Sequence, residues 1–344
     1  MIEVEPLGRG RDEQEWDSFI RTSRGAVIYH SLAYRNLLVE HLGCAAEYLV
    51  ARQGGEIRGV LPIMWTADPG ERVMNSLPFY GSHGGIIAAS LEIERALMDA
   101  WNARATDAST LAATMVANPF LECHSQRPVY GLTDERISQV TPLPSGASAA
   151  EIVALISREA RDNVRRAERR GVSVELDNDA IGEVSRIHRR NMLSVGGLAK
   201  SDELFASLPN HLRAGEDFDI WIARRAATVI AALLVLRFNG VAEYYASGTE
   251  LEHRPHNPHA ALLVAAMAHS AQRGCRLWNW GGTWLDQRGV YRFKRKWGAA
   301  DSRYRYYIQL NDRSLLDAAP DELLTRFPSF YVVPFTALRQ PVGQ

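Results

Sequence analysis

Four arginines recur at spacings of three and four residues in the segment ISREARDNVRRAERRG, and they are the first residues whose type and spacing could do chemistry. They are Arg158, Arg161, Arg165 and Arg169. Residues three and four apart share one face of a helix, so the spacing predicts a helix with a basic face. Guanidinium groups pair with phosphate oxygens in a bidentate way, so this face could hold a diphosphate or a nucleic-acid backbone. Acidic residues lie between the arginines, and a solvated helix with local ion pairs is the alternative.

A second segment with chemical potential begins at Arg276 with RLWNWGGT and continues from Tyr291 with YRFKRKWG. The first part predicts a strand that ends at two glycines, where a ligand can approach the backbone closely. The second part mixes cations with aromatic side chains, as single-stranded nucleic-acid sites do. The alternation of Trp278 and Trp280 also fits a strand with one face in the core.

Covalent catalysis is not predicted, because no serine or cysteine lies in a nucleophile motif with a histidine partner. Direct attack by an acceptor amine on an activated carbonyl is the simpler mechanism. A general base, if one is used, has the candidates Asp286, His253, His256 and His259. A polar loop and helix start is the alternative role for these histidines, and no zinc site is predicted there.

Composition describes a globular protein of 344 residues, with 46% hydrophobic and 23% charged residues and a formal net charge of −1. The length favours two domains. The cysteines Cys44, Cys123 and Cys275 are single and scattered, which favours buried apolar roles over a metal or disulfide framework. No stretch has the apolar core of a signal peptide or the roughly 20 apolar residues of a membrane span, so we expect a cytoplasmic protein.

The order of elements predicts an α/β or α+β fold. Runs at 48–52 and 57–65, separated by Gln53-Gly54-Gly55, predict a hairpin, and Phe218 to Phe238 predicts a second one. A helix is expected over 149–170, ended by Gly171, and the strand VSVEL follows. After the second hairpin we expect a strand at 242–247, a helix at 257–273, a strand at 276–280, a basic helix and a last strand at 304–310.

The two hairpins correspond at a constant offset of about 172 residues, which indicates an internal duplication. Two unrelated amphipathic hairpins are the alternative. Between the halves lies VTPLPSGAS, whose Pro, Ser and Gly content is typical of a linker. We therefore predict one domain at residues 1–145 and a second at residues 146–344.

Three segments together resemble the Fem-type (FemAB-like) transferases and the GNAT-like acyltransferases related to them. The run GGT-x6-VYRFKRKWG is similar to the signature near the end of these proteins. The pattern of Arg161, Asn163, Arg165, Ala167 and Gly171 resembles the basic helix at the start of their second domain, and IYHSLAY resembles their first-domain entry motif. The resemblance covers most of the chain. It implies two tandem GNAT-like domains, each with a mixed central sheet flanked by helices, in agreement with the element order.

The resemblance also implies site residues. The lysine of the F-K motif is Lys294, which would neutralise charge on the aminoacyl-tRNA end or on the reacting carbonyl, because a cation near a developing oxyanion stabilises the transition state. Tyr291 and Phe293 would position the reactants beside it, and these three form the predicted catalytic set. The predicted substrate-binding set consists of Arg161, Arg165, Asn163, Gly281, Gly282, Thr283, Arg292 and Tyr245.

The resemblance implies an acyltransferase that moves an aminoacyl or acyl group to an amine or hydroxyl of a cell-wall precursor, a sugar or a small molecule. Acetyl-CoA-dependent GNAT enzymes hold the pyrophosphate at an R/Q-x-x-G-x-G/A turn before the central helix. The corresponding stretch here, ELEHRPHNPH, contains no glycine. We therefore expect the acceptor end of aminoacyl-tRNA as donor, with acyl-CoA as the alternative, and no tightly bound cofactor. A non-catalytic protein that binds a glycan or nucleic acid is the alternative of a different class.

Overall fold

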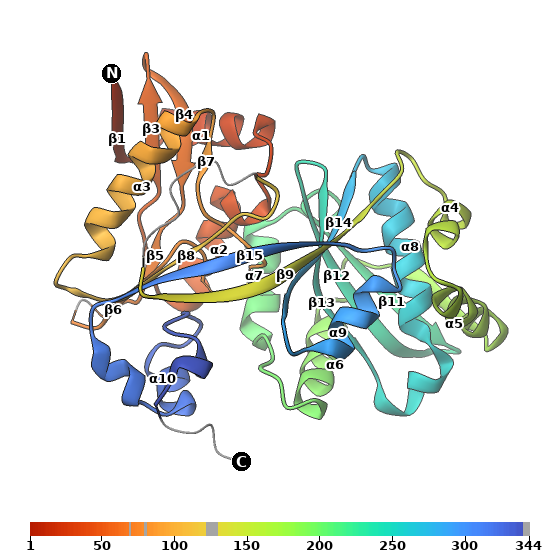
Figure 1. Cartoon of the computed structure of the whole chain (residues 1–344). Helices are drawn as coiled ribbons and strands as arrows, with labels where there is room; N and C mark the ends of the chain where they lie inside the picture. The colour runs from red at the N-terminus through yellow and green to blue at the C-terminus, as the bar shows by residue number, and fades with distance from the viewer. Residues whose placement is uncertain (69, 79–80, 122–129, 340–344) are drawn as a thin grey trace. The chain divides into compact units, whose positions relative to one another are not determined.

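The computed structural model describes residues 1–68, 70–78, 81–121 and 130–339 (Figure 1), so Cys123 lies outside the described residues. It divides the chain into two compact units. Unit 1 consists of residues 1–137 together with residues 303–344, and unit 2 consists of residues 138–302.

This division differs from the predicted domains at both ends of the second half. The first boundary falls at residue 137 instead of 145, because strand β9 (Leu132–Pro142) continues toward the linker without a break. Residues 303–344 belong to unit 1, because β15 (Ala300–Leu310) pairs antiparallel with β8 (Thr110–Val116) from Tyr306 to Leu310. A contact between strands so distant in sequence leaves no local pattern, which is why the sequence placed this segment wrongly.

Unit 1 contains a four-stranded sheet in the order β1-β3-β4-β7 and a second set of strands in the order β15-β8-β6-β5-β2. Helix α3 (Leu91–Ala105) lies against β1, β3 and β4 (Figure 1) and buries Trp101 and Leu97. The remaining elements of unit 1 are β1 Ile2–Pro6, α1 Arg11–Thr22, η1 Ile28–His30, α2 Leu32–Leu42, β2 Ala45–Ala46, β3 Leu49–Gln53, β4 Glu56–Leu61, β5 Met64–Trp65, β6 Arg72–Asn75, β7 Ile87–Ala88, η3 Arg313–Asp317, α10 Pro320–Arg326 and η4 Phe335–Ala337.

Unit 2 is built on strands in the order β10-β11-β12-β13-β14, which are antiparallel except for the parallel pair β13–β14. The strands are β10 Val172–Leu176, β11 Phe218–Arg225, β12 Thr228–Phe238, β13 Val241–Thr249 and β14 Leu277–Trp284. The helical elements are α4 Ala149–Leu155, α5 Arg158–Arg169, α6 Ile181–Ser194, α7 Asp202–His211, η2 Leu251–His256, α8 Pro258–Gln272 and α9 Arg288–Arg295.

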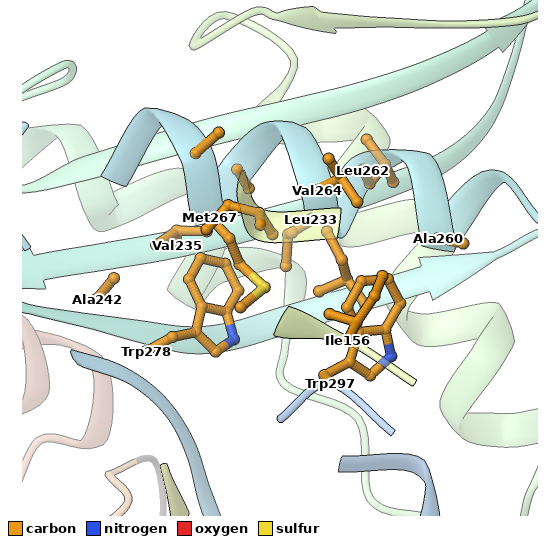
Figure 2. Packing of buried hydrophobic residues seen from close by; sticks show 14 of the residues in the cluster. Ile156, Leu233, Val235, Ala242, Ala260, Leu262, Val264, Met267, Trp278 and Trp297 are labelled. Carbon is orange, nitrogen blue, oxygen red and sulfur yellow. The ribbon is translucent and has the colours of Figure 1, made fainter. Parts of the chain in front are cut away.

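The core of unit 2 lies between the sheet and α8. Leu233 and Val235 of β12 and Trp278 of β14 are fully buried beside Met267 of α8 (Figure 2). Every residue from Ile230 to Leu236 is buried, so β12 is covered on both faces. Helices α4 and α5 pack beside α8. Helix α6 packs against β12 and β13, and α7 packs against α6.

The predicted helix over 149–170 is two helices. Ile156 is extended, with ψ of 163°, and Ser157 begins α5 as its N-cap, with its hydroxyl accepting from the Ala160 N–H at 3.2 Å. The Ser157 N–H donates to the Lys296 carbonyl at 2.8 Å, which fixes the start of α5. Gly171 follows α5 with φ of 70°, as the prediction of a glycine stop requires.

Each unit contains one of the two predicted hairpins, and the two hairpins correspond in their register. In β3–β4 the register shifts after Ala51, and in β11–β12 it shifts after Ala223, which is 172 residues further on. The first hairpin is shorter than expected, since β4 ends at Leu61 and Pro62 separates it from β5. The expected strand at 276–280 is longer, because β14 continues to Trp284 and therefore contains Gly281 and Gly282.

Candidate active site

The candidate site in unit 2 begins where β13 and β14 part. The two strands pair in parallel from Val241–Leu277 to Glu243–Asn279, and each continues beyond this ladder. At the last pair the buried Asn279 side chain donates to both carboxylate oxygens of Glu243, at 3.0 and 2.9 Å. The register of β12 on β13 also shifts here, which leaves Tyr245 as an extra residue in β13. Backbone beyond this point is therefore free of the β13–β14 ladder, as a ligand site requires.

A cavity of about 510 Å³ opens beside the parted strands. Its wall is formed by the first half of α5, the end of α6, the second half of β13, η2, the start of α8 and the end of α9. The lining residues are Ala160, Asn163, Asn191, Val195, Tyr244, Ser247, Gly248, Thr249, Arg254, Asn257, Pro258, His259, Ala260, Phe293, Lys296 and Trp297. Among these residues are two cations and no carboxylate, so the wall favours an anionic or neutral ligand. The volume is in the range of small-molecule sites.

The cations of the wall are held in different ways. Arg254 of η2 donates to the Asn191 side chain at 3.0 Å and to the Ser194 hydroxyl at 3.2 Å, both neutral acceptors on α6. Lys296 forms an ion pair with Glu159 of α5 at 2.5 Å. The Arg254 guanidinium therefore keeps more of its positive field available to a ligand.

The start of α8 differs from a glycine-rich phosphate turn. Residues Leu251–His256 form the short helix η2, and Asn257 then adopts a left-handed conformation with φ of 55°. Pro258 occupies the first turn of α8 and has no N–H, and the Ala260 N–H donates to the Asn257 carbonyl at 3.1 Å. Fewer backbone donors are thus available for a pyrophosphate than at an open helix start.

A chain of polar side chains lies in the cavity wall. The Tyr244 hydroxyl bonds to the Ser247 hydroxyl and, at 3.0 Å, to Nε2 of His259. Phe293 stacks on the His259 ring with centroids 5.8 Å apart. Burial lowers the pKa of His259 to about 4 and raises the pKa of Tyr244. At neutral pH the imidazole is therefore neutral and the phenol keeps its proton.

Lys294 is only 5% exposed, and its side chain is directed at β14. Its ammonium group donates to the Thr283 hydroxyl at 2.8 Å and to the carbonyls of Gly281 and Gly282 at 3.3 and 3.2 Å. Burial lowers its pKa to about 7. The three donors of the ammonium are thus matched by three acceptors, and the lysine fixes the strand at the two glycines.

The Thr283 hydroxyl links Lys294 to a further network. It donates to the Gln139 side chain at 2.9 Å, and Gln139 in turn donates to the Tyr291 carbonyl and to Asp301, each at 3.3 Å. The Tyr291 hydroxyl donates to Asp301 at 2.7 Å, and this bond raises the pKa of the tyrosine. Tyr291, Thr283 and Lys294 are therefore connected by hydrogen bonds, as residues of one cluster.

The predicted site residues divide into several positions in unit 2. Asn163 and Phe293 line the cavity, whereas Lys294, Thr283, Gly281, Gly282 and Tyr291 form the cluster on β14. Arg161 donates to the Ile156 carbonyl at 2.9 Å, Arg165 pairs with Asp162 at 3.3 Å, and Arg292 donates to the Arg288 carbonyl at 3.2 Å. These three arginines are absent from the cavity wall, because their guanidinium groups bond within or beside their own helices.

Tyr245 also does not line the cavity. It is 7% exposed and lies under the Lys200 ammonium, which is 4.9 Å from the ring centroid. Successive residues of a strand point to opposite faces, so Tyr244 and Tyr245 of β13 have different surroundings.

Sequence reasoning missed Tyr244, Ser247, Arg254 and Asn191. They come from a strand, a short helix and a separate long helix, so no spacing in the sequence connects them. His259 was among the candidate bases, and it is the one of the four that lines the cavity, whereas His253, His256 and Asp286 do not. The one sequence feature that could have pointed to Tyr244 as a site residue is its position on the strand before this histidine-rich segment.

Residues 157–295 match the family model described as an acetyltransferase (GNAT) domain. The matched segment lies within unit 2 and contains Lys294, Thr283 and all the lining residues of the cavity except Lys296 and Trp297. The search of curated proteins finds no match to the sequence.

Solved structures resemble the chain over nearly its whole length. FemX is 15% identical with a TM-score of 0.70, and the alignment covers 90% of this chain and 98% of FemX. A tandem GNAT protein from the clavulanic acid biosynthesis pathway is 14% identical with a TM-score of 0.52, covering 90% and 98% of the two chains. The C-terminal domain of a putative lysylphosphatidylglycerol synthetase from Agrobacterium fabrum is 11% identical with a TM-score of 0.53, covering 91% and 96%. The chain therefore has a Fem-like tandem GNAT fold, and the predicted fold class is confirmed.

No helix in the described part of the chain is long and apolar enough to cross a membrane. Within the same residues, no group of three or more His, Cys, Asp or Glu side chains is arranged to hold a metal ion. Cys44 and Cys275 are buried free thiols, and burial raises the pKa of each to about 11.

Proposed function

We propose that the chain is an aminoacyltransferase that binds the aminoacyl end of a charged tRNA in the unit 2 cavity and transfers the aminoacyl group to an amine or hydroxyl acceptor. The observation that carries this proposal is the cavity itself, which opens where β13 and β14 part and is lined by two cations without a carboxylate. A phosphate-bearing donor with a reactive carbonyl suits such a wall. This donor implies a reaction in the cytoplasm.

The proposed chemistry is direct attack of the acceptor on the activated carbonyl, without a covalent enzyme intermediate. Lys294 holds Thr283 and the two glycine carbonyls of β14 in place and adds a positive charge to this part of unit 2. Because this ammonium is absent from the cavity wall and already has three acceptors, its charge would stabilise a developing oxyanion through the electrostatic field and not through a direct hydrogen bond. Lys294→Ala is expected to remove most turnover. Circular dichroism of the variant separates this loss from unfolding. Unchanged turnover would show that Lys294 takes no part in the mechanism.

The start of α8 supports a tRNA donor over a CoA thioester. Pro258 lacks an N–H and the Ala260 N–H is already bonded, so the usual pyrophosphate turn has lost donors. The near-neutral net charge of −1 favours recognition of the acceptor end over binding along the whole tRNA, because nonspecific binding scales with the number of phosphates neutralised. The acceptor class is a peptidoglycan precursor, an amino sugar or a small amine.

The test is binding of aminoacyl-tRNA, uncharged tRNA and acetyl-CoA, measured by filter binding and by thermal shift, since a ligand that binds only the folded state raises its stability. Arg254→Gln removes a cation of the cavity wall. Because charge-assisted hydrogen bonds contribute about 1.5–3 kcal/mol, this variant should weaken donor binding by about tenfold or more. Arg11→Gln is the matched control, because its side chain is 89% exposed on α1 in unit 1. Equal loss in both variants, or none in Arg254→Gln, would contradict the proposal.

Acyl-CoA is the second candidate donor, and the match of residues 157–295 to an acetyltransferase domain favours it. The neighbour from the clavulanic acid pathway is described in a form without AcCoA, so that ligand is associated with a protein of similar fold. Stabilisation of the chain by acetyl-CoA, with no response to aminoacyl-tRNA, would establish this alternative and exclude the tRNA donor.

A further inference from the structure

Three hydroxyl and imidazole groups form one continuous hydrogen-bonded chain in the cavity wall. The Ser247 hydroxyl bonds to the Tyr244 hydroxyl, which lies 3.0 Å from Nε2 of His259. All three residues line the cavity, and they come from the end of β13 and the first turn of α8. A proton can therefore move between the middle of β13 and the start of α8 without leaving hydrogen-bond distance.

The direction of proton transfer along these three hydrogen-bonded side chains follows from their chemistry. Nε2 of a neutral imidazole can accept the Tyr244 O–H, and Nδ1 then carries the ring proton. The Tyr244 oxygen, having donated to His259, keeps lone pairs for the Ser247 hydroxyl or for a substrate N–H. A substrate can therefore meet this hydrogen-bonded series at Tyr244 and Ser247, and the proton acceptor is His259.

The groups that face His259 keep it neutral. Phe293 of α9 stacks on the ring, and Tyr244 of β13 bonds to it. The charged side chains of the cavity wall are Arg254 of η2 and Lys296 after α9. Burial lowers the pKa of His259 to about 4, so the resting imidazole is neutral, its Nε2 lone pair is available to accept a proton, and the proton that it accepts is held only transiently.

The far end of β13 is fixed by a second histidine. His188 of α6 is 5% exposed, and its Nε2 accepts from the Lys200 backbone N–H at 3.3 Å. An imidazole that accepts at Nε2 carries its proton on Nδ1, and this atom lies 3.3 Å from the Ser247 carbonyl. His188 therefore holds the Ser247 backbone in place, as a positioning residue.

We propose that Tyr244, Ser247 and His259 are the proton relay of acyl transfer, with the Tyr244 oxygen receiving the proton of the attacking nucleophile and His259 accepting the proton that Tyr244 gives up. The proposal rests on the proposed function. The nucleophile forms a bond to the carbonyl carbon as its N–H or O–H proton passes to Tyr244, directly or through Ser247. The bond to the leaving oxygen, or to sulfur for a thioester, then breaks, and the proton returns from His259 along the same chain to the leaving atom. No proton or electron is gained or lost overall.

The relay selects among the four candidate bases named from the sequence. His253, His256 and Asp286 do not line the cavity, and Asp286 is exposed. Glu243 is buried beneath the parted strands and accepts two hydrogen bonds from Asn279, and it is not part of the cavity wall. Tyr244 and His259 combine a position in the wall with a direct bond to each other.

The experiment measures kcat, KM and the solvent deuterium isotope effect for the full chain with its active donor. Tyr244→Phe and His259→Gln should each lower kcat by about 10²–10⁴-fold, the usual contribution of general acid–base catalysis, with KM changed less than about threefold. Ser247→Ala should lower kcat less. The wild type should show a deuterium effect on kcat that Tyr244→Phe loses, a readout that a purely structural role does not change.

Tyr130→Phe and His211→Gln are the matched controls, since they remove a phenol hydroxyl in unit 1 and an imidazole on α7 that do not line the cavity. Thermal unfolding of every variant separates loss of fold from loss of rate. Wild-type transfer with an unchanged kcat in Tyr244→Phe or His259→Gln would overturn the relay alone. Absence of transfer by the wild type with aminoacyl-tRNA and with acyl-CoA would overturn the relay together with the proposed function.

Discussion

The lowered pKa of Lys294 makes the stability of the chain depend on pH. Its pKa is lowered by burial to about 7 from an ordinary value of 10.5. Between these pH values the unfolded chain binds a proton that the folded chain does not, so folding becomes more favourable as pH rises. We expect the free energy of unfolding of the wild type, relative to Lys294→Met, to increase from pH 7 to pH 9.5 by at most about 1.4 kcal/mol per pH unit. Urea unfolding of both proteins at pH 7 and pH 9.5 measures this change. If the difference in free energy of unfolding between wild type and Lys294→Met is the same at both pH values, the lysine is not desolvated.

Single residues were the hardest part of the site to predict. The aromatic–lysine motif gave Phe293 and Lys294, but helix geometry directs Phe293 into the cavity and Lys294 onto β14. The arginines of α5 were chosen for a shared face, yet Asn163 is the polar residue of that helix in the cavity wall. A period of 3.6 places residues on a face, and only the packing of neighbouring helices decides which face meets the ligand.

The break between α4 and α5 permits a test at the level of the element. Ser157 and Ser148 are both N-cap residues, whose hydroxyls accept from the N–H groups of Ala160 and Glu151. Each serine-to-alanine change should therefore lower the free energy of unfolding by about 1 kcal/mol. Ser157→Ala should also raise the donor KM, because α5 contributes Ala160 and Asn163 to the cavity, whereas no residue of α4 lines it. Equal KM values for the two variants would show that the cavity does not depend on the start of α5.

Most elements of unit 2 could be predicted from hydrophobic periodicity, glycine stops and turn residues. The strand at 172–176, the strand around 242–247 and the helix at 257–273 were found within two residues of their bounds. The break at Ser157 was missed because the apolar residues before it, Ile152 and Ile156, and those after it, Ala160 and Val164, keep a spacing of four across it. The bond from the Ser157 N–H to the Lys296 carbonyl joins residues far apart in sequence and leaves no local signal. Capping residues are thus a better signal of a helix start than the apolar pattern alone.

At the scale of the molecule, duplication was the most informative sequence feature. The constant offset of the hairpins predicted two related halves, and the equivalent register shifts after Ala51 and Ala223 agree with it. The return of residues 303–344 to unit 1 could not be predicted, because it depends on the pairing of β15 with β8. The cavity could not be predicted either, since six separate elements contribute to its wall.

Buried neutral histidines in both units predict how the whole chain responds to acid. His30 and His83 in unit 1 are at most 1% exposed, and burial lowers their pKa values to about 4 and about 3; His188 and His259 in unit 2 are lowered to about 4. The unfolded chain binds protons at these positions below about pH 6.5, whereas the folded chain does not, so stability is present above that pH and is lost as pH falls toward 4. Each histidine adds at most about 1.4 kcal/mol per pH unit to this loss.

Urea unfolding at pH 7.5, 5.5 and 4.5 measures the effect, and His83→Phe is the variant that isolates one group. Phenylalanine keeps an aromatic ring beside Phe120, whose centroid lies 4.6 Å from that of His83, and it cannot bind a proton. We expect His83→Phe to lose less stability than the wild type between pH 6.5 and pH 4.5. If His83→Phe has the wild-type slope, the His83 imidazole is protonated or hydrated in the folded chain, and unit 1 then opens to water near this histidine well before it unfolds.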